Sequence, residues 1–393
     1  MFVIDEEYPT IIDGDANGFP VVKLEGTTKN ANRCTLKNLT LKNGKINSGE
    51  FGSILDIKVC NVPKIVNCQL KNGYGGSASV YVYYSDSVEF NNVQVVENDR
   101  FFRSFASTIS LNKCRICNNS DPEYISGFMV QRGSALINNS IFYNNQSGSE
   151  HADWRKYCVI CAYEDARLNI TNSTIMHNKG GNSINRGIHI AYNSKLFLRN
   201  TIIWGHDSSS VSLSFNNDSV DIDFCILQNE NNSIKNFASG SVILGENIIY
   251  DNPLITDTLY GFDPSLESPA LGSASPIYSS NDDYWGNPRP MPIGTNPDIG
   301  AFEVQESPAN KIFNLLYSES DKINIFPNSF DNNLTIKIEP NLIGEKISIF
   351  DQLGKHILSR KLNNAVNNLD LAHITKGIYF IQIGDWNYKI VKN

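Results

Sequence analysis

The sequence predicts an all-β protein in which a right-handed parallel β-helix of about eight or more coils precedes a small antiparallel β-sandwich. Three observations predict this fold: a strand-like repeat, an asparagine at one fixed place in most copies of it, and a change of pattern toward the C-terminus. Of the 393 residues, 41% are hydrophobic and 19% are charged, which is typical of a folded protein and excludes a disordered one.

The repeat consists of apolar residues that alternate with other residues around a corner position, and its eight copies lie 21 to 33 residues apart. Residues two apart lie on one face of a strand, so these apolar positions face the same way. If successive copies stack as turns of a solenoid, they form one continuous interior. The alternative, an antiparallel sandwich of short strands, needs hairpin turns instead of corners at a fixed register. The second apolar position holds Leu36, Ile65, Phe90, Leu111, Ile137, Ile170, Leu198 and Ile222.

Asparagine fills the corner between the two short strands of most copies. It tolerates the left-handed backbone conformation better than most residues with a side chain, so it suits a sharp bend. We expect these side chains to stack and to hydrogen-bond along the solenoid axis. A third strand precedes each pair, as in Leu55–Val59 and Val80–Tyr84, so each turn should contain three strands. The corner asparagines are Asn38, Asn67, Asn92, Asn139, Asn172 and Asn200.

Eight cysteines would suggest disulfides in an extracellular protein, but the repeat places most of them in the interior. Buried cysteines behave as small hydrophobic residues. Cys158 and Cys161 have the spacing of half a metal or redox site, yet they lie along a strand and have no second pair. We expect no metal there, and one bridge among Cys60, Cys117 and Cys158 stays open. The cysteines expected to face inward are Cys34, Cys68, Cys114, Cys161 and Cys225.

A Pro- and Gly-rich stretch follows the last copy and cannot continue the ladder, because proline lacks the backbone donor. Its characteristic segments are Gly245–Leu254, Ser268–Leu271, Asn281–Pro290 and Asp298–Glu303. Together with Thr10–Gly14, they resemble bacterial right-handed β-helix repeat proteins of the pectate-lyase-like superfamily over about residues 8 to 303. The resemblance implies a β-helix over residues 1–303 whose segment 230–303 caps the last apolar rung. Asp282, Asp283 and Asp298 are interpreted as stabilising this cap, in preference to a calcium or catalytic cluster.

The chain changes to short alternating strands after a polar linker at residues 304–320, which predicts an antiparallel sandwich over 321–393. This tail closely resembles the type A sorting domain of the type IX secretion system of Bacteroidetes, although Ser329 stands where that family usually has proline. The resemblance implies a partner in the type IX machinery, export across the outer membrane, and then release or anchoring at the cell surface. A generic immunoglobulin-like binding module is the alternative. The motifs on which the resemblance rests are Ile323–Asn328, Ile347–Lys355, Gly377–Ile381 and Lys389–Lys392.

Net charge and hydropathy limit the kinds of partner and the cellular location that the sequence allows. The net charge of −8 argues against nucleic acid, because phosphate binding needs a basic face. No run approaches the roughly 18 apolar residues of a transmembrane segment, and we expect a monomer. An exported protein needs a signal peptide, and Met1–Glu7 does not have the pattern of one, so we expect that residues before Met1 are missing.

The outward positions of the third strand form the candidate binding face, because enzymes of the family it resembles bind polysaccharides in a groove on one outward strand face. Aromatic rings can stack on sugars, and arginine or lysine can pair with a uronate carboxylate. The insertion Gln146–Tyr157 adds Glu150, His151, Asp153, Trp154 and Arg155 nearby. The substrate-binding residues predicted on the face are Lys58, Tyr81, Tyr83, Arg103, Arg132 and His189.

Two hypotheses about function follow. In the first, the protein is a non-catalytic surface protein that binds polysaccharide or another extracellular partner. In the second, it is a polysaccharide lyase or glycoside hydrolase that acts on an acidic polysaccharide at the same face. We assign no catalytic residue, because no clean carboxylate pair occupies neighbouring coils. We predict neither a metal ligand nor a cofactor, and calcium stays an open alternative.

Overall fold

A computed structural model describes the chain at the residues that follow. They are 10–27, 34–47, 49, 51–121, 126–147, 158–180, 186–206, 209–255, 262–305, 323–327, 330–351, 355–383 and 386–393. The chain divides into two compact units, Met1–Gln305 and Glu306–Asn393, and each is described by itself.

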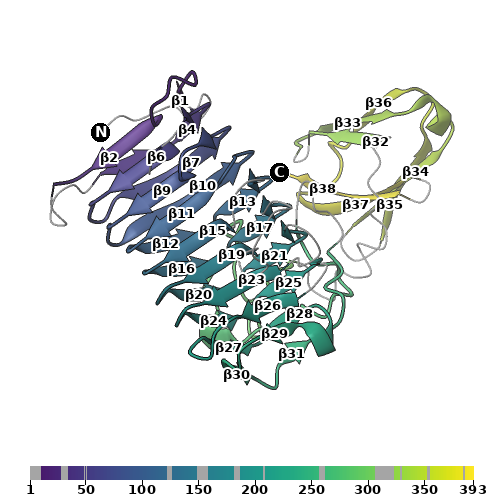
Figure 1. Cartoon of the computed structure of the whole chain (residues 1–393). Coiled ribbons are helices and arrows are strands. Elements are labelled where there is room, and N and C mark those ends of the chain that lie inside the picture. Colours follow the sequence, from purple (N-terminus) through teal and green to yellow (C-terminus); the bar gives the residue numbers. More distant parts are fainter. Residues whose placement is uncertain are drawn as a thin grey trace. The chain divides into compact units, whose positions relative to one another are not determined.

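The first unit is a parallel β-helix with three strands in most turns (Figure 1). One face is a nine-stranded sheet, called here the first sheet, in which each turn contributes one strand and every pairing is parallel. Its strands are β2 (Val22–Glu25), β6 (Gly52–Lys58), β9 (Ala78–Tyr83), β11 (Phe102–Phe105), β15 (Ser126–Gln131), β19 (Cys158–Tyr163), β23 (Arg186–Ala191), β26 (Ser209–Leu213) and β29 (Ile234–Asn236).

The other two faces belong to a 17-stranded sheet that bends at a corner within each turn. Short strands β5 (Lys45–Ile46), β8 (Tyr74–Gly75), β14 (Ser120–Asp121), β18 (Gln146–Ser147) and β22 (Lys179–Gly180) lie between the faces. The large sheet contains β1 (Thr10–Asp13), β3 (Thr35–Lys37), β4 (Leu39–Lys42), β7 (Lys64–Lys71), β10 (Val88–Val96), β12 (Thr108–Asn112), β13 (Arg115–Cys117), β16 (Ser134–Asn138), β17 (Ile141–Tyr143), β20 (Arg167–Thr171), β21 (Thr174–Met176), β24 (Lys195–Arg199), β25 (Ile202–Trp204), β27 (Ser219–Asp223), β28 (Cys225–Leu227), β30 (Ser241–Leu244) and β31 (Ile248–Ile249).

The register confirms the predicted stacking. Leu36 pairs with Ile65, Ile65 with Phe90, and Phe90 with Leu111. The same alignment continues through Ile137 and the later copies to Ile222. These side chains lie in one buried apolar interior that runs along the unit.

The corner asparagines are also confirmed. All six have positive φ angles between 46° and 58°. Their side chains form the predicted ladder at several steps: Asn67 donates to Asn38 at 3.2 Å, and Asn92 donates to Asn67 at 3.0 Å. Backbone that would be strained for most residues is therefore accommodated by the residue type that tolerates it best.

A second asparagine ladder lies inside the unit and was not predicted. Its members are at most 2% exposed. In the first three members, the amide nitrogen donates to the carboxamide oxygen of the next turn at 2.9 to 3.0 Å and to a backbone carbonyl. The amide nitrogen of the last member donates to the Phe142 carbonyl. The amides therefore satisfy one another and backbone carbonyls of the preceding turn, which makes their burial favourable. The ladder consists of Asn98, Asn119, Asn145 and Asn178.

The cysteine predictions are confirmed in part. Cys68, Cys114 and Cys225 are buried and free, and burial raises the pKa of the Cys114 and Cys225 thiols to about 12, so these thiols are unreactive. The prediction that Cys161 faces inward was wrong. Cys161 aligns with Met129 and His189 on the outward side of the first sheet, and it is disulfide-bonded. Cys34, Cys60 and Cys117 are free, and Cys34 is only half-buried.

The closing stretch does not lie where we expect an end cap. Residues 230–249 form a further turn with β29, β30 and β31. Inward-facing Val242 and Leu244 of this turn remain 36% and 44% exposed. The later residues run back along the side of the β-helix instead. The Ser275 carbonyl accepts a hydrogen bond from the Asn200 side chain, and Asp282 forms an ion pair with Lys113 of a much earlier turn. The segment therefore covers outward-facing apolar residues of several turns.

The second unit is the predicted antiparallel sandwich. A three-stranded sheet holds β32 (Ile323–Phe326), β33 (Asn333–Ile338) and β36 (Val366–Asp370). A four-stranded sheet holds β35 (His356–Lys361), β34 (Lys346–Asp351), β37 (Gly377–Ile383) and β38 (Trp386–Lys392). The two sheets enclose an apolar core of their own.

Candidate functional site

The six predicted binding residues lie on or next to the outward side of the first sheet, in rows that follow the solenoid axis. One row, called here the inner row, aligns through the strand register, and its members are Asp56, Tyr81, Arg103, Met129, Cys161 and His189. The neighbouring row, called the outer row, aligns Lys58, Tyr83, Phe105, Gln131 and Tyr163. Arg132 follows the outer row at a corner with positive φ.

The inner row is largely buried, contrary to our expectation of an accessible face. Tyr81 and His189 are each only 1% exposed. The His189 ring lies between two hydroxyls, with Nδ1 2.8 Å from Ser212 Oγ and Nε2 3.3 Å from Ser214 Oγ. A side chain this enclosed serves the packing of the sheet better than it serves a ligand.

The inner row also contains a buried carboxylate. Asp56 is fully buried and accepts a hydrogen bond from the Gly52 amide at 3.1 Å. Burial raises its pKa, because the nearby ammonium of Lys58, 3.7 Å away, offsets only part of the desolvation. The Lys58 ammonium also lies 3.9 Å from the centre of the Phe51 ring, so this predicted binding residue already has protein partners.

The outer row and the corner that follows it carry several partly exposed aromatic residues. Tyr83 and Phe105 stack with ring centres 5.5 Å apart, and Tyr192 contacts Phe215 at 4.0 Å. Tyr84 and Tyr192, at the corner, are 41% and 42% exposed. We call this set the aromatic strip. It consists of Tyr83, Tyr84, Phe105, Tyr163, Tyr192 and Phe215.

A polar cluster divides the aromatic strip into two groups. Arg132 Nε lies 2.7 Å from Glu164 Oε2, which also accepts a hydrogen bond from Gln131 at 3.0 Å. Gln131 in turn accepts a hydrogen bond from Arg103 at 3.0 Å. The Arg132 guanidinium lies 5.5 Å from the centre of the Phe105 ring, so the cluster adjoins the first aromatic group. We call Arg103, Gln131, Arg132 and Glu164 the polar break.

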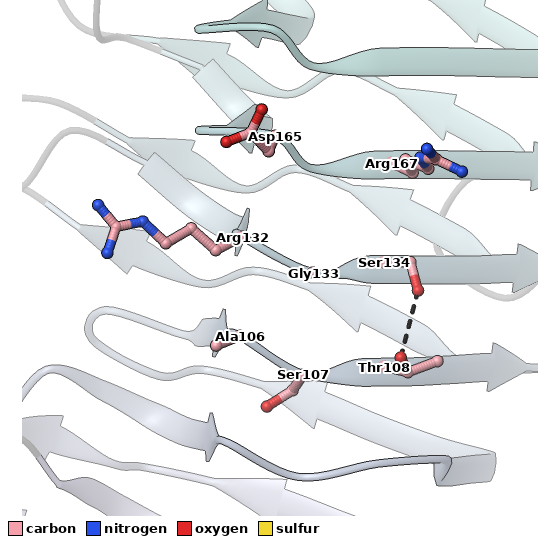
Figure 2. A pocket seen from close by; sticks show the side chains of 8 residues that line it. All are labelled: Ala106, Ser107, Thr108, Arg132, Gly133, Ser134, Asp165 and Arg167. Carbon is pink, nitrogen blue, oxygen red and sulfur yellow. Dashed lines mark hydrogen bonds between the residues drawn. The ribbon is translucent and has the colours of Figure 1, made fainter.

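Next to the polar break the surface is hollowed over about 260 Å³ (Figure 2). Three successive turns line the hollow with Ala106–Thr108, Arg132–Ser134, and Asp165 with Arg167. The hydroxyls of Thr108 and Ser134 lie 3.4 Å apart. Both charge signs and several hydroxyls therefore meet at this corner.

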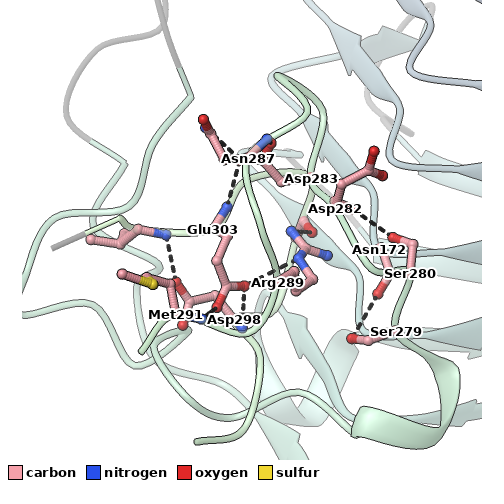
Figure 3. Close-up of polar contacts among 12 residues, drawn as sticks. Asn172, Ser279, Ser280, Asp282, Asp283, Asn287, Arg289, Met291, Asp298 and Glu303 are labelled. Atoms are coloured by element: carbon pink, nitrogen blue, oxygen red, sulfur yellow. Dashed lines mark hydrogen bonds and ion pairs between the residues drawn. The ribbon is translucent and has the colours of Figure 1, made fainter. Parts of the chain in front are cut away.

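The acidic residues of the closing stretch form a structural cluster around one arginine (Figure 3). Glu303 lies 3.1 Å from Arg289, and both side chains are fully buried. Its carboxylate also accepts hydrogen bonds from the amides of Met291 and Asp298. Asp283 accepts bonds from Asn287 and the Glu303 amide, so the interpretation of these residues as stabilising is consistent with their contacts.

This cluster predicts a pH-dependent stability. Burial raises the pKa of Glu303 to about 7, and the charge of Asp298 adds to the rise. The folded protein then holds the proton more tightly than the unfolded chain, so the stabilisation is complete below the ordinary pKa of 4.5 and is lost as pH rises through 7. Relative to Glu303→Gln, which cannot ionise, the wild type should lose roughly 1–3 kcal/mol between pH 5 and 8 in denaturant unfolding. Parallel pH profiles for the two proteins would contradict this.

Sequence reasoning missed most of the aromatic strip. It found Tyr83 but not Tyr84, Phe105, Tyr163 or Tyr192, although an aromatic residue at the end of several third strands was a readable signal. The insertion residues Glu150, His151, Asp153, Trp154 and Arg155 lie outside the described residues.

Within the described ranges, no three His, Cys, Asp or Glu side chains gather as a metal site, and no helix has the length and hydropathy to cross a bilayer.

Comparison with known proteins identifies the family of the C-terminal unit. No curated protein matches the chain. Residues 324–393 match the secretion system C-terminal sorting domain family, and the antiparallel sandwich described above occupies the same residues. This domain implies a link to the type IX secretion machinery. The chain is therefore an exported protein, secreted or held at the cell surface, in which a parallel β-helix precedes a secretion system C-terminal sorting domain.

Proposed function

We propose that the β-helix is a glycan-binding body that holds a polysaccharide chain along the aromatic strip once the protein has been exported. The observation that carries this proposal is the row of partly exposed rings on the turns to either side of the polar break. Sugar rings present C–H groups on their faces, and aromatic rings bury such surfaces at little cost in conformational entropy. Tyr83, which the sequence predicted, belongs to this strip, and Arg132 borders it.

The geometry of the strip favours a linear chain. With neighbouring strands about 4.8 Å apart, the five steps from Tyr84 to Phe215 span roughly 24 Å along the axis. A binding surface of this length accommodates several consecutive sugars, with aromatic platforms on either side of the polar break. The polar break in the middle offers hydrogen-bond donors and acceptors to sugar hydroxyls.

The alternative, a lyase or hydrolase, has less support. A lyase needs an accessible base, and His189 is enclosed between two serines while the Arg132 Nε is paired with Glu164. A hydrolase needs two carboxyl groups on either side of the scissile bond. Ultraviolet absorbance after incubation with uronate polymers, with and without calcium, tests this alternative directly, since lyase products absorb.

We expect that removing either exposed corner ring weakens glycan binding about tenfold, or roughly 1.4 kcal/mol. Tyr84→Asn and Tyr192→Asn are suitable variants, because asparagine tolerates the positive φ of both positions. A glycan array with the full chain identifies ligands, and calorimetry with the strongest one measures the loss. Tyr74→Asn is the matched control, since Tyr74 is 61% exposed on β8 outside the strip. Unchanged affinity in both strip variants would reject the site.

A further inference from the structure

The hollow beside the polar break has a fixed place relative to the aromatic strip. Ala106 directly follows Phe105, and Arg132 belongs to both the polar break and the hollow. Asp165 directly follows Glu164. The hollow thus lies around the corner from the middle of the strip, where the row of rings is interrupted, and Figure 2 shows its residues on three neighbouring turns.

The lining indicates which chemical group fits. Arg132 and Arg167 supply donors, and Asp165 supplies an acceptor that already binds the Asn193 amide at 2.5 Å. Thr108 and Ser134 add hydroxyls. The carboxylates of Asp165 and Glu164 offset the two arginines, so the corner favours a neutral, hydroxyl-rich group over an anion.

The size of the hollow limits that group. Sites for drug-sized ligands are usually about 300–1,000 Å³, and this one is near 260 Å³. One sugar fits such a space, whereas a chain of sugars does not. The strip beside it is long enough for a chain.

We infer that the hollow is a subsite for a single-sugar branch, carried by a glycan whose backbone lies on the aromatic strip. This inference rests on the proposed function. The substrate class is therefore a neutral polysaccharide with short side branches. A branch attached at the polar break turns the corner between Arg132 and Gly133 and meets Ser134 and Arg167 on the adjoining sheet.

The test compares branched and unbranched glycans that share a backbone. The probes are galactomannan against linear mannan, xyloglucan against linear β-glucan, and arabinoxylan against linear xylan, each titrated into the full chain. We expect at least one branched member to bind tenfold or more tightly than its linear partner. Equal affinity of branched and linear members that do bind would overturn the inference and leave the strip intact. Binding of no glycan at all would overturn the proposed function itself, and the inference with it.

Two variants locate the effect. Ser134→Tyr fills the hollow from an ordinary strand position, so it should abolish the preference for the branched probe and leave linear binding within twofold. Ser219→Tyr is the matched control, because Ser219 lies in the same row of the sheet, beyond Arg167 and Lys195. Tyr192→Asn should weaken both probes alike. A branch preference that survives in Ser134→Tyr would contradict the assignment.

Discussion

Replacing Asn145 by alanine is expected to destabilise the β-helix by about 3–5 kcal/mol. Asn145 is 1% exposed and occupies an inner position of the buried asparagine ladder. Its oxygen accepts bonds from the Asn119 backbone and side chain, and its nitrogen donates to the Ile116 carbonyl and to Asn178. Alanine leaves these four partners without water or protein to replace the lost bonds, so each pays part of its desolvation cost.

The effect should be specific to the buried ladder. Asn169→Ala is the matched control, because Asn169 is an exposed asparagine on β20, and its change should stay within about 0.5 kcal/mol. Urea unfolding of the full chain, followed by circular dichroism, measures both. If Asn145→Ala and Asn169→Ala lose similar stability, the ladder does not stabilise the interior as described.

The second large effect is expected for Phe128→Ala, which should cost about 3–5 kcal/mol. Phe128 is fully buried on β15. Its ring contacts Phe102 at 4.8 Å and Phe142 at 5.3 Å between centres, and Phe102 contacts Phe90 in turn. Removing the ring opens a cavity at the middle of a row of packed rings, where the rigid strands on either side limit collapse.

A graded series tests the packing. Phe128→Leu keeps most of the volume and should lose clearly less than Phe128→Ala. Hydrogen exchange should show the lowest protection in the turns next to Phe128, because turns of a solenoid depend mainly on their neighbours. A loss below about 1 kcal/mol for the alanine variant would mean that this residue does not lie in a close-packed interior.

Local chemistry explains what was predictable from the sequence. The alternation at Leu36, Ile65 and Phe90 and the asparagine at the corners are one-dimensional signals, and they fixed the register and the three-strand turn. The antiparallel tail followed from alternation in the same way. These features depend on backbone conformation and on which side of a strand a residue takes.

Non-local contacts explain what was not predictable. The residue types and strand positions of Tyr81 and His189 do not indicate that both side chains are only 1% exposed. The Ser212 and Ser214 hydroxyls that enclose the His189 ring belong to the next turn, more than 20 residues away in the sequence. Asn118 and Asn119 are adjacent asparagines with opposite surroundings, one at an exposed corner and the other in the interior ladder. The course of the closing stretch back along several turns could not be read from its Pro and Gly content.

The central claim is that one glycan chain lies along the β-helix axis over the two groups of the aromatic strip. Calorimetric titration of the full chain with oligosaccharides of increasing length, from the best-bound polysaccharide, tests it most directly. We predict that affinity rises with each added sugar until the oligosaccharide spans roughly 24 Å, then levels off. Affinity that is already maximal for a disaccharide would contradict the claim, because a single small subsite would then account for all binding.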